Sequence, residues 1–342
     1  MPADRHSPFT PARWLPGAHA QTLWGKLARR SPQVATRAEQ WDTPDGDQLE
    51  LQRLGAPSAR DDTPRLLLLH GLEGTIRSHY LRGMLAVARA RGWPADVIIF
   101  RSCNGAIPRA RRLYHSGETT DLDFVVRRLI GQEPDRPLLL AGFSLGGNVL
   151  LKWLGEQGAA APSQLRAAAA VSVPFDLGRG AREIEHGFSR LYTRHFLRSL
   201  RAKARATFAR YPARFDLDRV AAARTLWAFD DSVTAPLHGF RDAADYYARS
   251  SSIGFLTDIR VPTLLINALD DPFLPREVLD DVALLARRND YLSLDFPDHG
   301  GHVGFVGGRW PWRPAYYIEQ RVPDFLASHV TSSSPAARAP SP

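Results

Sequence analysis

Short, mostly apolar runs recur along this 342-residue chain and constrain its fold more than any other feature. Between them, residues 78–91, 118–130 and 148–157 have the apolar spacing of helices. Runs of this length suit strands buried on both faces, and strands that alternate with helices form a mostly parallel sheet covered on both sides. The sequence therefore predicts an α/β fold. The runs lie at residues 65–70, 96–100, 137–143, 167–173, 261–268 and 291–296.

The interval between Val173 and Val261 breaks this alternation, and residues 179–210 within it have helical periodicity. We interpret residues 176–259 as a helical cap inserted into the core. One face of the expected helix carries Phe188, Leu191 or Tyr192, Phe196 and Leu200, and another carries Arg190, Arg194, Arg198, Arg201 and Arg205. The arginine stripe is interpreted as a solvated face, and a surface that attracts anionic lipid or substrate is the alternative.

The other boundaries follow from the same pattern. Residues 41–175 and 260–328 form the expected α/β core. Residues 1–40 contain several prolines and are expected to be an irregular lead-in that packs on this core. The last residues, 329–342, are rich in Ser, Pro and Ala and are expected to be a disordered tail.

Ser144 lies at the centre of Gly142-Phe-Ser-Leu-Gly146, between an apolar run and a helical pattern. In a strand–turn–helix context the two glycines let the chain turn sharply and leave the serine hydroxyl exposed above the sheet, at the start of a helix. That helix end favours developing negative charge. The context predicts a nucleophilic serine and the α/β-hydrolase fold, an eight-stranded, mostly parallel sheet flanked by helices, here with the inserted helical cap.

A serine nucleophile needs a base and an acid, which follow it in the order Asp or Glu, then His, in this fold. His302 is favoured over His299 as the base, because it follows a Gly-Gly pair that suits a loop lowering the ring onto the serine. Asp271 is favoured over Asp270, because an Asp directly before Pro is the usual form of this loop. The backbone amides of Leu72 and Leu145 are the expected oxyanion-hole donors.

His70 precedes Ser144, which is the wrong order for the base, so it is interpreted as a structural loop residue.

The net charge of +8 could indicate nucleic acid, an anionic membrane or an acidic substrate. The excess is almost all arginine, with three lysines, and no nucleic-acid recognition motif accompanies it, so no nucleic-acid partner is expected. The single cysteine excludes an internal disulfide. Without an apolar leader or a run of ~20 apolar residues, a cytoplasmic location and no transmembrane segment are expected, and peripheral membrane contact stays open.

Several motifs together resemble the YheT-like family of α/β hydrolases, which is related to eukaryotic α/β-hydrolase-domain phospholipase-like proteins. The resemblance covers roughly residues 8–328 and implies a carboxylic-ester hydrolase without a cofactor, whose triad falls on Ser144, Asp271 and His302. The chain departs from the family at residues 101–105, which leaves substrate preference open. The motifs are residues 17–22, 70–74, 114–121, 142–148, 229–236, 246–251, 268–273 and 300–305.

Two of these regions have alternative interpretations. Residues 114–121 are interpreted as a helix start and packing motif, with pocket lining as the alternative, and their spacing does not suggest metal ligands. Cys103 is interpreted as a small buried residue rather than a second nucleophile.

The sequence thus predicts a serine esterase that acts on small-molecule or lipid esters through an acyl-enzyme, with no cofactor and no metal. A thioesterase or amidase of the same fold, or a catalytically silent binding scaffold, is the alternative. The oligomeric state is not indicated.

Overall fold

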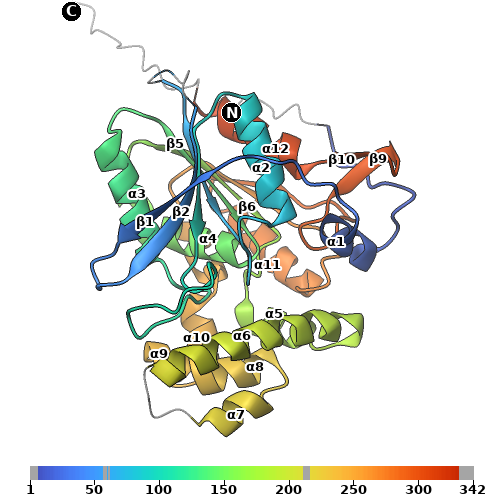
Figure 1. Ribbon diagram of the computed structural model, residues 1–342. Helices are drawn as coiled ribbons and strands as arrows, with labels where there is room; N and C mark the ends of the chain where they lie inside the picture. Colours follow the sequence, from blue (N-terminus) through green and yellow to red (C-terminus); the bar gives the residue numbers. More distant parts are fainter. Residues whose placement is uncertain (1–6, 57–59, 61, 211–215, 331–342) are drawn as a thin grey trace, which may run out of the picture.

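The computed structural model describes residues 7–56, 60, 62–210 and 216–330, so most of the expected tail lies outside the described residues. Eight strands form one sheet in the order β1-β2-β4-β3-β5-β6-β7-β8 (Figure 1). β1 and β2 run antiparallel to their neighbours, and the other strand pairs are parallel. The predicted eight-stranded, mostly parallel sheet is therefore confirmed. The strands are β1 (Arg37–Asp42), β2 (Gln48–Leu54), β3 (Arg65–Leu69), β4 (Ala95–Ile99), β5 (Leu138–Phe143), β6 (Leu165–Val171), β7 (Thr263–Ile266) and β8 (Leu292–Asp295).

Helices cover both faces of this sheet. α2 (His79–Ala90) packs against α12 (Ile318–Ser328) in front of the sheet in Figure 1, whereas α4 (Leu145–Gln157) lies behind it. The helix α3 (Thr120–Gln132) packs beside α4. The central strands are buried because both of their faces are covered, whereas the edge strand β8 is mostly half-exposed. A further helix of the core is α11 (Arg276–Ala286).

The chain between β6 and β7 forms a group of helices at one end of the sheet (Figure 1), which we call the cap helices. They are α5 (Leu177–Glu183), α6 (Arg190–Arg210), α7 (Leu217–Ala222), α8 (Leu226–Phe229), a π-helical turn (Asp230–Thr234), α9 (Ala235–His238) and α10 (Ala243–Ser250). A 3-10 segment (Ser252–Asp258) leads back to the core. Part of this group has its own apolar cluster, which includes Leu197, Phe208 and Phe229, apart from the main core.

The expectation that residues 179–210 are helical was only partly right, because two α-helices share this range and the chain between them, residues 184–189, is not α-helical. The break follows α5, and Gly187 within it adopts φ +50°, a conformation that helices do not use. The expected apolar face was also only partly right, because Phe188 and Leu191 are about half exposed while Leu197 is buried. Four arginines of the stripe are exposed, and Arg201 is half-buried and donates to the carbonyl of Ala223.

The expectation of an irregular lead-in over residues 1–40 was only partly right, since α1 (Ala18–Leu27) lies within it and β1 begins at Arg37, while residues 7–17 and 28–36 contain no helix or strand. The side chain of Gln21 is buried and exchanges two hydrogen bonds with the backbone of Val306, at 3.0 and 2.7 Å. This helix has a glycine as its N-cap and no side-chain cap, so the usual local signal for a helix start is missing.

Val306 begins a separate antiparallel hairpin of β9 (Val306–Trp310) and β10 (Arg313–Tyr316).

Candidate active site

Ser144 lies in the sharp turn between β5 and α4, with φ +52° and ψ −122°. The turn is tight because two glycines flank it. A Cβ on Gly142 would lie 2.4 Å from the carbonyl oxygen of Gly146, and one on Gly146 would lie 2.5 Å from that of His70. Such a backbone conformation is strained for a non-glycine residue and is held here by the surrounding packing. The serine hydroxyl therefore stands at the carboxyl edge of the sheet.

Ser144, His302 and Asp271 form a continuous hydrogen-bonded series. The Ser144 Oγ lies 2.9 Å from the Nε2 of His302, and the Nδ1 of His302 lies 2.8 and 3.1 Å from the two carboxylate oxygens of Asp271. Ser144 follows β5, Asp271 follows β7 and His302 follows β8. Parallel strands bring their carboxyl ends to one edge of the sheet. The His302 and Asp271 side chains are 10% and 2% exposed, so water competes little for this contact.

The competing residues Asp270 and His299 lie beside this series and contact each other, with 3.2 Å between Oδ2 and Nδ1. The imidazole of His299 is largely exposed, at 64%. Asp270 accepts a hydrogen bond from the Gly301 amide at 2.9 Å, so it fastens the loop that carries His302. Of the two aspartates, Asp271 is the one that contacts the His302 ring.

The helix α1 holds the His302 loop in place, which the sequence did not reveal. Thr22 Oγ1 accepts a hydrogen bond from the backbone amide of His302 at 2.9 Å. A Cβ on Gly301 would lie 2.3 Å from the carbonyl oxygen of Ala18, so this loop and α1 are in close contact. The ring of Phe273 stacks on the imidazole, with 4.1 Å between centroids. The motif at residues 17–22 was visible in the sequence, but its partner was not.

Leu72 and Leu145 both lie around Ser144, on the wall of a pocket. Leu145 is the first residue of α4, and amides in the first turn of a helix have no acceptor within it. The loop before Leu72 passes directly against Ser144, because a Cβ on Gly71 would lie 3.0 Å from the serine Cβ.

His70, at the start of the same loop, is fully buried and has a structural place. Its Nε2 accepts from the Phe100 amide and its Nδ1 donates to the Gly71 carbonyl. Burial lowers the pKa of His70 to about 4, so the ring is neutral at pH 7.

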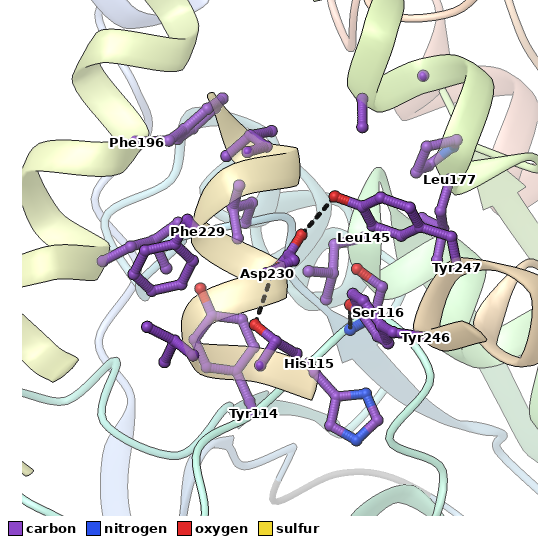
Figure 2. A pocket seen from close by; sticks show the side chains of 18 of the residues that line it. Tyr114, His115, Ser116, Leu145, Leu177, Phe196, Phe229, Asp230, Tyr246 and Tyr247 are labelled. Carbon is purple, nitrogen blue, oxygen red and sulfur yellow. Dashed lines mark hydrogen bonds between the residues drawn. The ribbon is translucent and has the colours of Figure 1, made fainter. Parts of the chain in front are cut away.

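A pocket extends from Ser144 into the space beneath the cap helices, and Figure 2 shows much of its wall. It holds about 1070 Å³ that protein atoms do not fill, part of it open to solvent. Phe196 and Leu200, from the expected apolar face of α6, line it. A pocket with a mostly apolar wall can enclose an apolar group of a small molecule. Its other apolar walls include Leu113, Leu177, Ile184, Leu226, Phe229, Val233 and Leu237.

Asp230 is an acidic residue on this otherwise mostly apolar wall. One carboxyl oxygen accepts a hydrogen bond from the hydroxyl of Thr234 at 2.5 Å. The other accepts a hydrogen bond from the hydroxyl of Tyr247 at 2.6 Å (Figure 2). Burial beneath the cap raises the pKa of Asp230 to about 6. The sequence motif at 229–236 contained this residue but did not indicate its surroundings.

The pKa of Asp230 gives a testable dependence of stability on pH. A raised pKa means that the folded protein holds this proton more tightly than the unfolded chain, so its stability falls as pH rises from about 4 to about 6. Asp230→Asn has a neutral amide at this position, which does not ionise as the pH rises. We expect the variant to gain up to about 3 kcal/mol in free energy of unfolding, relative to the wild type, between pH 4 and pH 7. Urea unfolding at several pH values measures this difference.

Asp218→Asn, at an exposed position of α7, is the matched control. If the stability of Asp230→Asn relative to the wild type changed with pH no more than that of Asp218→Asn does, the raised pKa of Asp230 would be contradicted.

Glu73, next to Leu72, joins the core to the cap helix α6. Its carboxylate accepts hydrogen bonds from Lys203 Nζ at 2.7 Å, from the Tyr114 hydroxyl at 2.6 Å and from Ser199. The Lys203 and Glu73 side chains are 19% and 9% exposed, so the ion pair is largely shielded from water.

The surroundings of Glu73 include two residues whose roles the sequence left open, Tyr114 and Cys103. Tyr114, from the motif at 114–121, lines the pocket and binds Glu73. Cys103 is buried, 3.3 Å from the Nζ of Lys203, and burial raises the pKa of its thiol to about 11. A buried, protonated thiol matches the interpretation of a small buried residue.

Removing the cation of this pair should destabilise the fold. Lys203→Met leaves the Glu73 carboxylate in a shielded place with fewer donors. Hydrogen bonds to charged groups contribute about 1.5–3 kcal/mol, so we expect a loss of that size in the free energy of unfolding. Chemical denaturation measures it, with Lys26→Met at an exposed position as the control. Equal stability of both variants would show that the pair contributes nothing.

Among the described residues, no helix is both long enough and apolar enough to cross a membrane. Within the same residues, no group of three or more His, Cys, Asp and Glu side chains could hold a metal ion.

Comparisons with known proteins give one family model and several relatives. The model, described as the alpha/beta hydrolase fold, matches residues 64–308. The protein with the name "Putative esterase YheT", from Escherichia coli (strain K12), is 38% identical over 95% of this chain and 95% of its own length. Phospholipase ABHD3 of Mus musculus is 30% identical over 94% of this chain and 79% of its own length. Among solved structures, the Pyrococcus furiosus esterase Pf2001 is similar in fold, with a TM-score of 0.55 and 17% identity over 88% of this chain and 97% of its own.

Proposed function

Because this chain belongs to the YheT-like family of α/β hydrolases, we propose that it is a serine hydrolase that cleaves carboxylic esters through a Ser144–His302–Asp271 triad. The observation that carries the proposal is the hydrogen-bonded series from Ser144 through His302 to Asp271, at the mouth of a mostly apolar pocket. The relatives that carry the names esterase and phospholipase support an ester as the bond that is cleaved.

In the first half of the proposed reaction, His302 Nε2 removes the hydroxyl proton as Ser144 Oγ attacks the ester carbonyl carbon. Negative charge develops on the carbonyl oxygen, and the amides of Leu72 and Leu145 stabilise it. The C–O bond to the alcohol then breaks, and the proton on His302 passes to the leaving oxygen. This step leaves an acyl group on Ser144.

In the second half, a water molecule gives a proton to His302 and attacks the acyl-enzyme, which releases the acid and restores Ser144. Asp271 keeps the proton of the neutral imidazole on Nδ1 and stabilises the imidazolium that forms twice in the cycle.

The pocket supports a small-molecule or lipid ester as the substrate class. Its apolar wall, with side chains such as Phe196, Leu200 and Phe229, would take up the hydrocarbon part of an acyl group or alcohol. The monoacylglycerol lipase of Saccharomyces cerevisiae, 31% identical over 74% of this chain and 58% of its own length, is a further relative whose name concerns a lipid ester.

A panel of p-nitrophenyl esters of increasing acyl length tests the proposal, with matched acyl thioesters and anilides beside it. We expect hydrolysis of the esters, and covalent labelling of the wild type but not of Ser144→Ala by a fluorophosphonate probe. Hydrolysis of the thioesters or anilides alone would instead indicate a thioesterase or amidase. A protein that hydrolyses nothing in the panel and is not labelled would be a silent scaffold, and labelling of Ser144→Ala would overturn the assignment of the nucleophile.

A further inference from the structure

We propose that the turn of the β9–β10 hairpin is an anchor that inserts into the surface of an anionic lipid bilayer. Trp310 pairs with Arg313 in the hairpin, which leaves Pro311 and Trp312 as its turn. We call the five residues 309–313, with the sequence Arg-Trp-Pro-Trp-Arg, the hairpin tip, and all five are exposed. The β9–β10 pair forms its own two-stranded sheet beside the main one, and Figure 1 shows it at the rim of the core, away from the cap helices.

The two tryptophans give the hairpin tip an apolar surface that faces water. Trp310 is 46% exposed and Trp312 is 72% exposed. Their rings stack nearly in parallel, with 5.2 Å between centroids and 8° between planes, so they form one continuous aromatic surface. Monomeric proteins keep such surfaces small unless they bind something. An indole combines an apolar body with one N–H donor, which suits the boundary between lipid headgroups and acyl chains.

Two positive charges flank this aromatic surface. The guanidinium of Arg309 lies over the ring of Trp310, 5.1 Å from its centroid, and Arg313 follows Trp312 in sequence. Among the described residues, no carboxylate lies within ion-pair distance of either arginine. The charges are therefore available to an external anion, and the net charge of +8 acts in the same direction. Anionic headgroups would satisfy the arginines while the tryptophans enter the interface.

The base of the hairpin is hydrogen-bonded to the N-terminal segment, so the hairpin tip is formed in advance. The Ala12 amide donates to the Val306 carbonyl at 2.9 Å, and the indole N–H of Trp14 donates to the Gly308 carbonyl at 3.0 Å. An anchor that is already ordered loses less conformational entropy when it binds.

The end of α1 offers a second apolar contact beside the hairpin. The Trp24 indole donates to the Tyr316 hydroxyl at 3.4 Å, and Arg29 lies over the Tyr316 ring, so α1 and β10 are neighbours. Three residues after Trp24, Leu27 is 74% exposed. Leu27 is thus an exposed apolar side chain on the helix that neighbours β10.

Tryptophan and arginine side chains also bind single-stranded nucleic acid, by stacking and by charge. That mode needs a basic groove that follows a strand, whereas the hairpin tip is the turn of a projecting hairpin. A convex tip fits between lipid headgroups. The choice of lipid over nucleic acid also rests on the proposed function, because a lipid ester reaches its enzyme from a membrane.

Binding to vesicles of non-hydrolysable, ether-linked lipids tests the proposal independently of any ester hydrolysis. We expect the wild type to bind phosphatidylglycerol–phosphatidylcholine vesicles about tenfold or more tightly than pure phosphatidylcholine vesicles, and added salt to weaken this binding. Trp310→Ala/Trp312→Ala should lower the affinity about tenfold or more. Arg309→Gln/Arg313→Gln should remove the preference for phosphatidylglycerol. In the wild type, lipids brominated near the headgroup should quench tryptophan emission.

Phe188→Ala/Leu191→Ala is the matched control, because these cap residues are also about half exposed and lie beside the arginine stripe. Loss of binding in this variant and not in the tryptophan variant would overturn the proposal. So would unchanged binding of the tryptophan variant, absence of vesicle binding, or binding of an oligonucleotide without vesicle binding. If the tryptophan variant unfolds, absence of quenching in the wild type would by itself overturn the proposal. Vesicle binding without esterase activity would refute only the proposed function. Esterase activity without vesicle binding would refute only this anchor.

Discussion

Replacing His302 with alanine is expected to lower kcat for ester hydrolysis by roughly 10⁶-fold, with little change in KM. Its Nε2 lies 2.9 Å from Ser144 Oγ, so the ring is placed to accept the serine proton. Without it the hydroxyl stays protonated at neutral pH and attacks poorly. The pocket and the two amides of the proposed oxyanion hole would remain, so substrate binding should persist. Steady-state kinetics on the best ester of the panel measure both constants.

His299→Ala is the control, because its exposed ring is three residues away in the same loop and contacts Asp270 instead of Ser144. We expect a change of no more than about twofold, as for most surface substitutions. A large loss of kcat in this variant together with a small loss in His302→Ala would show that His299, and not His302, is the base. Circular dichroism of both variants shows whether the loop change affects folding.

Local sequence patterns were enough to predict the sheet and to predict that Ser144, Asp271 and His302 lie close together. Each of these residues follows an apolar run, and parallel strands necessarily end at one edge, so their meeting needed no long-range information. The choice between Asp270 and Asp271 depended on the Asp-Pro pair, and the structure places Asp271 against the His302 ring. The catalytic roles of these residues stay predictions.

The parts that sequence reasoning missed depend on contacts between distant segments. Thr22 holds the backbone of His302, which is 280 positions further along the chain, and no local pattern reveals such a pair. The same holds for Glu73 and Lys203, which connect the core to α6. The break before α6 was missed for another reason. Helical periodicity reports which residues share a face, and it continues across a short stretch such as residues 184–189, where the chain has left the α-helical conformation.

Changing Asp271 to asparagine is expected to lower kcat by roughly 10⁴-fold and to leave the fold intact. The carboxylate accepts a hydrogen bond from Nδ1 of His302, which leaves Nε2 free to accept the serine proton. An asparagine amide can donate to Nδ1 instead, and the ring proton then moves to Nε2, where it faces Ser144. The serine loses its base although every group is still in place. The kcat of this variant and its rate of fluorophosphonate labelling should fall together.

Asp270→Asn separates this effect from a general disturbance of the loop. Its Oδ1 accepts from the Gly301 amide, and an asparagine carbonyl can still accept there, so the His302 loop keeps its support. We therefore expect a loss of less than about tenfold, since this residue does not contact the His302 ring. Equal and large losses in both variants would mean that the two aspartates act as one unit that positions the loop. A larger loss in Asp270→Asn would transfer the acid of the triad to that residue. The difference between the two variants thus measures what the contact between Asp271 and the imidazole contributes, apart from the shape of the loop.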